Sequence, residues 1–180
     1  KKPKDFLKRS GMLPKGILLY GPKGTGKTTL ARAMAGESDV AFFQTSAAEF
    51  KGPRTGESEA NIKRIFERAR KYAPAIIFID EIDAIGRKRD GSDPRTEGML
   101  TVLFTQMDGF LGADSNRPVF VLAATNYGAT AEDDGIGSLD EALLRRFDNQ
   151  IYVDLPNESE REQYILKMLA GRNITTVSED

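Results

Sequence analysis

The sequence contains no cysteine and no histidine among its 180 residues. Without cysteine, the chain has neither a disulfide framework nor a thiolate metal site. Without histidine, it lacks the commonest general base and metal ligand. These two absences exclude a histidine-based hydrolase and an H-E-x-x-H zinc site within this chain.

The sequence also lacks a signal peptide and any apolar run long enough to span a bilayer. We therefore expect an intracellular protein, cytoplasmic or tethered to a membrane by a segment outside this chain and facing the cytoplasm or an organelle interior. An excess of one charge is missing too, because 26 Lys and Arg stand against 27 Asp and Glu. This balance argues against nucleic acid or an anionic membrane as a general partner.

Short apolar runs alternate with helical patterns along the chain, which predicts an α/β fold with a mainly parallel sheet. The length suits one domain with a sizeable core. The predicted strands cover residues 16–20, 40–45, 75–79, 119–124 and 151–154. The predicted helices cover residues 28–35, 58–71, a stretch around 99–107, and 157–171, where Asn157 and Glu160 form a capping pair. Residues 86–94 and 128–138 are predicted loops.

A glycine-rich turn between the first strand and the first helix fits the pattern G-x-x-x-x-G-K-[ST]. Glycines there let backbone N–H groups curl around phosphate oxygens, and the following helix adds its partial positive charge. We expect Lys27 to reach the β- and γ-phosphates of ATP, the Thr28 hydroxyl to bind Mg²⁺, and the Lys23 side chain to point to solvent. The predicted nucleotide-binding set is Gly21, Pro22, Lys23, Gly24, Thr25, Gly26, Lys27, Thr28 and Thr29.

Polar side chains end two of the buried strands. Asp80 and Glu81 follow the third strand, and ligands of open α/β sheets bind at the carboxyl ends of strands. We expect Asp80 to hold Mg²⁺ together with Thr28, and Glu81 to orient or deprotonate the attacking water. Asp83 is expected to be structural. Asn126 follows the fourth strand and can hydrogen-bond the water or the γ-phosphate.

An arginine doublet, Arg145 and Arg146, follows the short apolar run LDEALL. The residues alone leave two interpretations open, an ordinary pair of surface charges or a pair that acts on a ligand. Adjacent residues of a helix point about 100° apart, so the two side chains are not expected to reach one oxygen by the same path.

The order GPKGTGKT, IIFIDEID, LAATN and LDEALLRRF resembles the AAA ATPases over nearly the whole chain. The stretches PKGILLYGP, AFFQTSAAEF and QMDGF are most similar to FtsH-type AAA modules of membrane-bound proteases. The segment LDEALLRRF followed by IYVDLPN is more similar to the microtubule-severing and ESCRT-disassembling group.

The resemblance implies a P-loop NTPase three-layer sandwich, with a five-stranded sheet of order 5-1-4-3-2. It implies a ring hexamer with ATP between neighbours, Asn126 as γ-phosphate sensor, and Arg145 and Arg146 as arginine fingers. It also implies an AAA large subdomain at residues 1–156 and the truncated start of a helical lid at residues 157–180. The resemblance further implies that ATP hydrolysis drives remodelling or unfolding of protein substrates, and it is compatible with a motor for a metalloprotease whose peptidase lies outside this chain.

The sequence departs from the family pattern at the pore position and in one loop. Arg54-Thr55-Gly56 stands where family members have an aromatic residue that grips substrate, and the loop 127–138 is long and acidic. The arginine keeps a second function open, a nucleotide-dependent assembly scaffold that threads no polypeptide. A nucleic-acid motor is a third and weaker alternative, because no basic stripe is present.

Overall fold

A five-stranded sheet forms the centre of the protein in a computed structural model, which describes residues 16–38, 40–54, 56–87, 94–109, 118–126 and 139–170. The strands are β1 (Gly16–Tyr20), β2 (Ala41–Ser46), β3 (Ala75–Asp80), β4 (Val119–Thr125) and β5 (Asn149–Tyr152). Their order is β2-β3-β4-β1-β5, and every pairing is parallel. The predicted fold class and strand order are confirmed.

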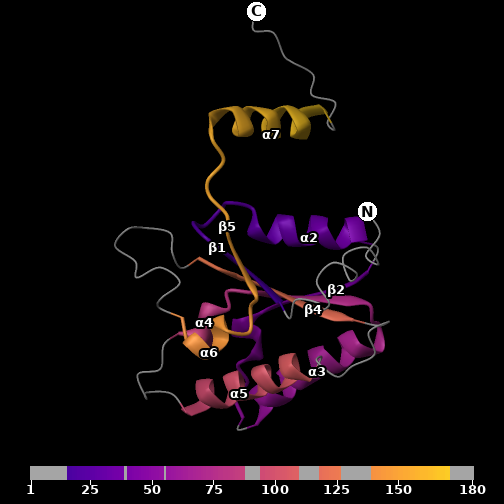
Figure 1. Cartoon of the computed structure of the whole chain (residues 1–180), viewed down its shortest axis with the longest axis vertical. Coiled ribbons are helices and arrows are strands. Elements are labelled where there is room, and N and C mark those ends of the chain that lie inside the picture. The colour runs from indigo at the N-terminus through magenta and orange to yellow at the C-terminus, as the bar shows by residue number, and fades with distance from the viewer. Residues whose placement is uncertain are drawn as a thin grey trace, which may run out of the picture.

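Helices cover both faces of the sheet, as Figure 1 shows. The helix α2 (Lys27–Ser38) lies on one face, while α3 (Glu57–Lys71) and α5 (Pro94–Asp108) lie on the other. The short helices α4 (Asp83–Gly86) and α6 (Glu141–Leu144) lie on the side of α3 and α5. A 3₁₀ turn, η1 (Ala47–Phe50), joins β2 to the loop before α3.

Alternating side chains of the central strands build two separate cores. Ile77 and Ile79 of β3 pack with the larger cluster, against α3 and α5, whereas Ile76 and Phe78 pack with Ala31 on the side of α2. This alternation follows from the two-residue period of a strand. The strands read as continuous apolar runs because both of their faces are buried.

The fifth strand begins two residues earlier than the predicted range 151–154. Asn149 pairs with Ile17 and Tyr152 pairs with Tyr20, so the polar residues Asn149 and Gln150 belong to the ladder. All four residues of β5 are exposed at the sheet edge. An edge strand pairs through its backbone without needing apolar side chains, which is why the hydrophobic pattern misplaced its start.

The last described helix, α7 (Glu158–Ala170), stands apart from the sheet in Figure 1 and has no buried residue. Its predicted capping pair is confirmed: Glu160 N–H donates to Asn157 Oδ1 at 3.0 Å, and Asn157 N–H donates to Glu160 Oε2 at 2.8 Å. No described helix combines the length and apolar character needed to cross a membrane. The predicted loop 128–138, and most of the loop 86–94, lie outside the described residues.

Candidate active site

A cleft of about 390 Å³ opens at the carboxyl ends of the central strands. Parallel strands bring their carboxyl ends to one edge, so residues far apart in the chain meet there. Its lining consists of Lys23, Gly24, Gly26, Lys27, Thr28, Thr29, Asp80, Glu81 and Asn126. The structure therefore brings together most of the predicted phosphate loop, the acidic pair and the predicted sensor.

The loop between β1 and α2 has the backbone shape that the glycine pattern predicts. Gly24 and Gly26 have φ angles of +80° and +87°, a region that other residues rarely occupy. The Thr25 hydroxyl donates to Pro22 O at 3.1 Å and tightens the turn. The loop ends at the first turn of α2, whose free N–H groups are a site for a phosphate.

The Lys27 ammonium lies inside this loop and is buried. Its Nζ donates to Gly21 O at 2.9 Å and to Pro22 O at 2.7 Å. Burial lowers the pKa of Lys27 from its ordinary value, while the negative charges of Asp80 and Asp83 oppose that shift. A cation held by neutral carbonyls inside a glycine-rich loop is suited to bind an anion that enters the loop.

The Thr28 hydroxyl and the Asp80 carboxylate meet at the floor of the cleft. Thr28 Oγ1 donates to Asp80 Oδ2 at 2.9 Å, although 52 residues separate them in the chain. Mg²⁺ prefers hard oxygen ligands and commonly takes only one or two from the protein, with waters and phosphates completing the shell. The donor set fits such an ion, and no group of three or more acidic residues in the described part offers a larger cage.

Glu81 follows β3 with an unusual backbone. Its φ angle is +50°, and among the described residues it is the only one other than glycine with a positive φ. Its N–H donates to Asp80 Oδ1 at 2.9 Å, so both Asp80 oxygens accept hydrogen bonds. The turn leaves the Glu81 side chain exposed at the cleft. Such strain is typical of functional positions.

Two further polar residues near the strand ends, Asn126 and Asp83, differ in whether they line the cleft. Asn126 lines the cleft, as predicted. Asp83 instead accepts a hydrogen bond from the buried Thr125 hydroxyl at 2.7 Å, which ties the start of α4 to the end of β4. This contact supports a structural role for Asp83.

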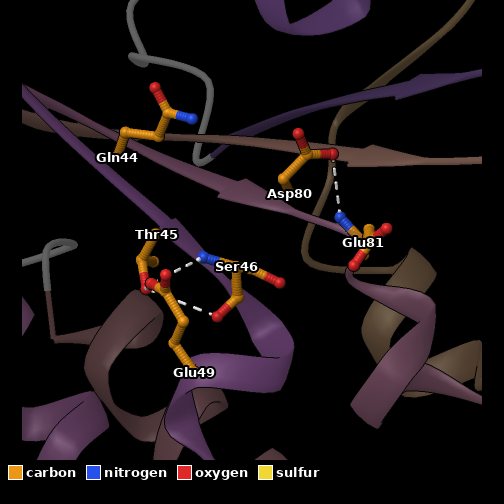
Figure 2. Close-up of a pocket in the computed structure, with 6 residues that line it drawn as sticks. All are labelled: Gln44, Thr45, Ser46, Glu49, Asp80 and Glu81. Carbon is orange, nitrogen blue, oxygen red and sulfur yellow. Dashed lines mark hydrogen bonds between the residues drawn. The ribbon is translucent and has the colours of Figure 1, made fainter. Parts of the chain in front are cut away.

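A second hollow, of about 280 Å³, shares Asp80 and Glu81 with the cleft and extends to the end of β2. Figure 2 shows its six lining residues, with Ser46 on the strand beside Asp80 and Glu49 below it. Glu49 Oε2 accepts from Thr45 Oγ1 at 2.8 Å and from Ser46 N–H at 3.1 Å. The sequence did not predict that Ser46 and Glu49 line a hollow beside Asp80 and Glu81. The S-x-x-E capping signature that begins at Ser46 was the local pattern that pointed to these two residues.

The arginine doublet is not among the residues that line the cleft and lies in the turn directly after α6. The Arg145 side chain is 75% exposed and pairs with Glu141 at 3.2 Å, one turn earlier on the same helix. An exposed pair of this kind contributes only about 0.3–0.5 kcal/mol. Arg145 is therefore free to exchange Glu141 for a more strongly charged partner.

Arg146 is held within its own subunit. Its Nη2 pairs with Asp108 Oδ2 at 2.9 Å, and its guanidinium lies over the Phe104 ring, 4.9 Å from the centroid. Its Nη1 also donates to Ala142 O at 3.4 Å, and only 26% of the side chain is exposed. The adjacent arginines thus have different surroundings, which their sequence does not indicate.

Arg54 lies in the loop between η1 and α3, and its side chain is exposed. The backbone around it is ordered by Glu57, which accepts from Arg54 N–H at 3.2 Å and packs against Gly52. Gly52 N–H also donates to Ser58 Oγ at 2.9 Å. The loop is thus braced from α3, and Arg54 projects from it.

Comparison with known proteins matches residues 17–155 to the family described as "ATPase family associated with various cellular activities (AAA)". Curated relatives named "ATP-dependent zinc metalloprotease FtsH" include those of Ureaplasma parvum, 42% identical over 97% of this chain, and Cupriavidus metallidurans, 47% identical over 93%. "ATP-dependent zinc metalloprotease FTSH 2, chloroplastic" of Arabidopsis thaliana is 45% identical over 95% of this chain.

These alignments cover 23%, 25% and 24% of the respective relatives, so the chain spans about a quarter of their length. The residues matched by the family, 17–155, include the phosphate loop, the carboxylate pair at the end of β3 and the arginine segment. Together with the geometry of the cleft, the family match shows that the chain belongs to the AAA family, and over this quarter it is similar to the relatives named FtsH.

Proposed function

We propose that this chain hydrolyses ATP with Mg²⁺ inside a ring of identical subunits, a hexamer, and thereby remodels or unfolds protein substrates. The observation that carries the proposal is the separation of two parts. The cleft is lined by the Lys27 side chain, the two carboxylates and the Asn126 amide, and Arg145 is not among its lining residues. The exposed Arg145 instead directly follows α6, a helix on the opposite side of the sheet from α2. An exposed arginine that does not line its own cleft is suited to serve a neighbour's.

The residues of the cleft divide the chemistry between them. Lys27 and the loop N–H groups bind the phosphates, and Thr28 and Asp80 hold Mg²⁺, which neutralises phosphate charge when bound. Water attacks the γ-phosphorus, the bond to the β,γ-bridging oxygen breaks, and Glu81 accepts the proton of the water. Asn126 orients the water or the γ-phosphate, and the neighbour's Arg145 stabilises the charge that spreads over the γ-phosphoryl oxygens.

The names of the relatives support a motor that serves a peptidase. This chain has no histidine for a zinc site of the H-E-x-x-H type, so a peptidase would belong to a part of the protein outside it. The same names favour the motor over a scaffold that only assembles on ATP. We place the protein inside the cell, cytoplasmic or tethered to a membrane from outside this chain, and expect no nucleic acid as partner.

We also propose a division of the chain into two parts. We place the AAA large subdomain at residues 1–156 and the start of a helical lid at 157–180. Every residue of α7 is exposed, including Tyr164, Ile165 and Leu166, which supports a boundary before this helix. Apolar residues on a helix without a packing partner suit an element that continues into a further domain.

The ATP turnover per chain is expected to rise with protein concentration and to level off once rings are complete. The reason is that each cleft needs the Arg145 of a neighbour. Steady-state phosphate release across a dilution series, with ring formation followed by light scattering, measures this dependence. A turnover per chain that stays constant across dilution, where scattering reports separate subunits, contradicts a shared site.

The Arg54→Phe variant is expected to unfold a tagged fluorescent substrate several-fold faster than the wild type. Phenylalanine has a flat apolar face that wedges between polypeptide side chains, and arginine has none. Loss of substrate fluorescence under saturating ATP measures the rate, and Lys63→Ala on the exposed face of α3 is the matched control. If neither protein unfolds the substrate while both hydrolyse ATP, the scaffold function is the correct one.

A further inference from the structure

The short helix α4 connects the acidic strand end with the core of the sheet. It begins two residues after Glu81, and the intervening Ile82 is fully buried. Ile82 N–H donates to Ala124 O on β4 at 3.0 Å. Ile85, in the middle of α4, is also fully buried. The position of α4 is therefore set by the same strand ends that carry the catalytic carboxylate.

The arginine segment is attached to the far end of α4. Asp140 N–H donates to Gly86 O at 2.8 Å, and Arg87 and Leu139 form an antiparallel bridge. Asp140 then caps α6, because its Oδ1 accepts from Ala142 N–H at 2.8 Å and Leu143 N–H at 3.2 Å. The backbone segment that leads into α6 therefore pairs with the segment that leaves α4.

Gly86 provides the space into which α6 packs. A Cβ atom at this position would overlap Leu143 Cδ2 and lie 3.7 Å from Leu139 Cδ2. Both leucines are fully buried, so neither side chain can turn out into solvent. An added methyl group would therefore displace the Leu143 side chain and, because packed interiors have few voids to absorb it, push on α6 through that side chain.

We propose that Gly86 is a positioning residue for Arg145, because it sets the distance between α4 and the one-turn helix α6, which Arg145 caps at its C-terminal end. Arg145 N–H bonds to Glu141 O at 3.0 Å, so a shift of α6 moves Arg145 with it. This inference rests on the proposed function, in which Arg145 acts on a neighbour's nucleotide. Gly86 itself touches neither nucleotide nor reacting atoms.

The first test compares Gly86→Ala with the wild type in the assembled protein. Turnover is expected to fall about 10- to 100-fold, since misplacing a catalytic group by about 1 Å costs on the order of 100-fold. Affinity for a fluorescent ATP analogue is expected to stay unchanged. Gly36→Ala is the matched control, because a Cβ there meets no atom within 4 Å. Unchanged turnover in Gly86→Ala overturns the inference.

A second variant separates displacement of α6 from general damage. Leu143→Val removes both Cδ atoms, including the one that a Cβ at residue 86 would overlap. The double variant Gly86→Ala/Leu143→Val is expected to regain turnover relative to Gly86→Ala alone, because contacting sites couple. If the losses of turnover in the two single variants simply add in the double variant, the packing argument is contradicted.

The ATP turnover of rings mixed from two variants is a measurement that distinguishes a misplaced arginine from a purely structural defect. Glu81→Gln subunits keep a normal arginine but lack the base, whereas Gly86→Ala subunits keep the base and present a misplaced arginine. Rings mixed from both are expected to hydrolyse well above the average of the two pure variants, because Glu81→Gln neighbours supply correctly placed arginines to intact clefts.

The reference mixture is Arg145→Ala with Glu81→Gln. If this mixture recovers activity and the Gly86→Ala mixture does not, Gly86 acts within its own cleft and the inference fails. If neither mixture recovers, the action of Arg145 on a neighbour is wrong, and the proposed function fails together with the inference that rests on it.

Discussion

ATP turnover of the assembled protein is expected to fall about 10³–10⁵-fold when Arg145 is replaced by alanine, while ATP affinity stays unchanged. The γ-phosphoryl oxygens gain negative charge during hydrolysis, and Lys27 with Mg²⁺ neutralises only part of it. Arg145 is the exposed member of the doublet and is held only by a weak surface pair with Glu141. Steady-state phosphate release and equilibrium binding of a fluorescent ATP analogue measure the two quantities.

Two variants serve as comparisons for Arg145→Ala. Glu141→Ala removes the surface partner of Arg145 and is expected to keep turnover close to that of the wild type. Arg146→Ala is expected to lower both the turnover and the thermal midpoint. This variant removes the ion pair with Asp108 and the contact with Phe104. Normal hydrolysis by Arg145→Ala would return this side chain to the role of a surface charge.

Glu81→Gln is expected to lower turnover about 10²–10⁴-fold without weakening ATP binding, because glutamine keeps the shape but cannot accept the proton of the attacking water. Glu81 has the positive φ angle itself, its side chain is exposed, and it lines the cleft. Rapid-quench measurement of a single turnover isolates the chemical step from product release.

Asp83→Asn is the matched control for this prediction. It removes the same charge two residues away, and the asparagine amide oxygen can still accept from Thr125 Oγ1. We expect Asp83→Asn to keep most of the turnover. Equal losses of turnover in the two variants would show that charge near the cleft matters more than a base at position 81. That result would contradict the assignment of Glu81 as the base.

Local sequence signals predicted the parts of the site whose chemistry lies within a few consecutive residues. The phosphate loop is contiguous, and its glycines, lysine and threonine work through one turn of backbone and the helix that follows. Asp80 and Glu81 end a run of apolar residues, so their place at the carboxyl edge follows from the strand itself. The α/β class followed equally from the alternation of strand and helix patterns.

Local sequence signals did not predict where β5 begins or that Ser46 and Glu49 line the second hollow. Pairing of β5 with β1 is a matter of backbone register, which polar side chains at an exposed edge do not reveal. Ser46 comes beside Asp80 only because β2 and β3 are neighbours in register. A capping signature indicates the local turn, and the neighbouring strand determines what that turn faces.

The phosphate loop, the carboxylate pair and the two adjacent arginines could all be recognised from the amino-acid sequence, because each of these features is local in the chain. Only the tertiary structure distinguished the arginines. Arg146 meets Asp108, 38 residues away, whereas Arg145 extends from a helix that packs on Gly86. Contacts across such separations depend on how helices pack against one sheet, and residue spacing along the chain carries no direct record of that packing.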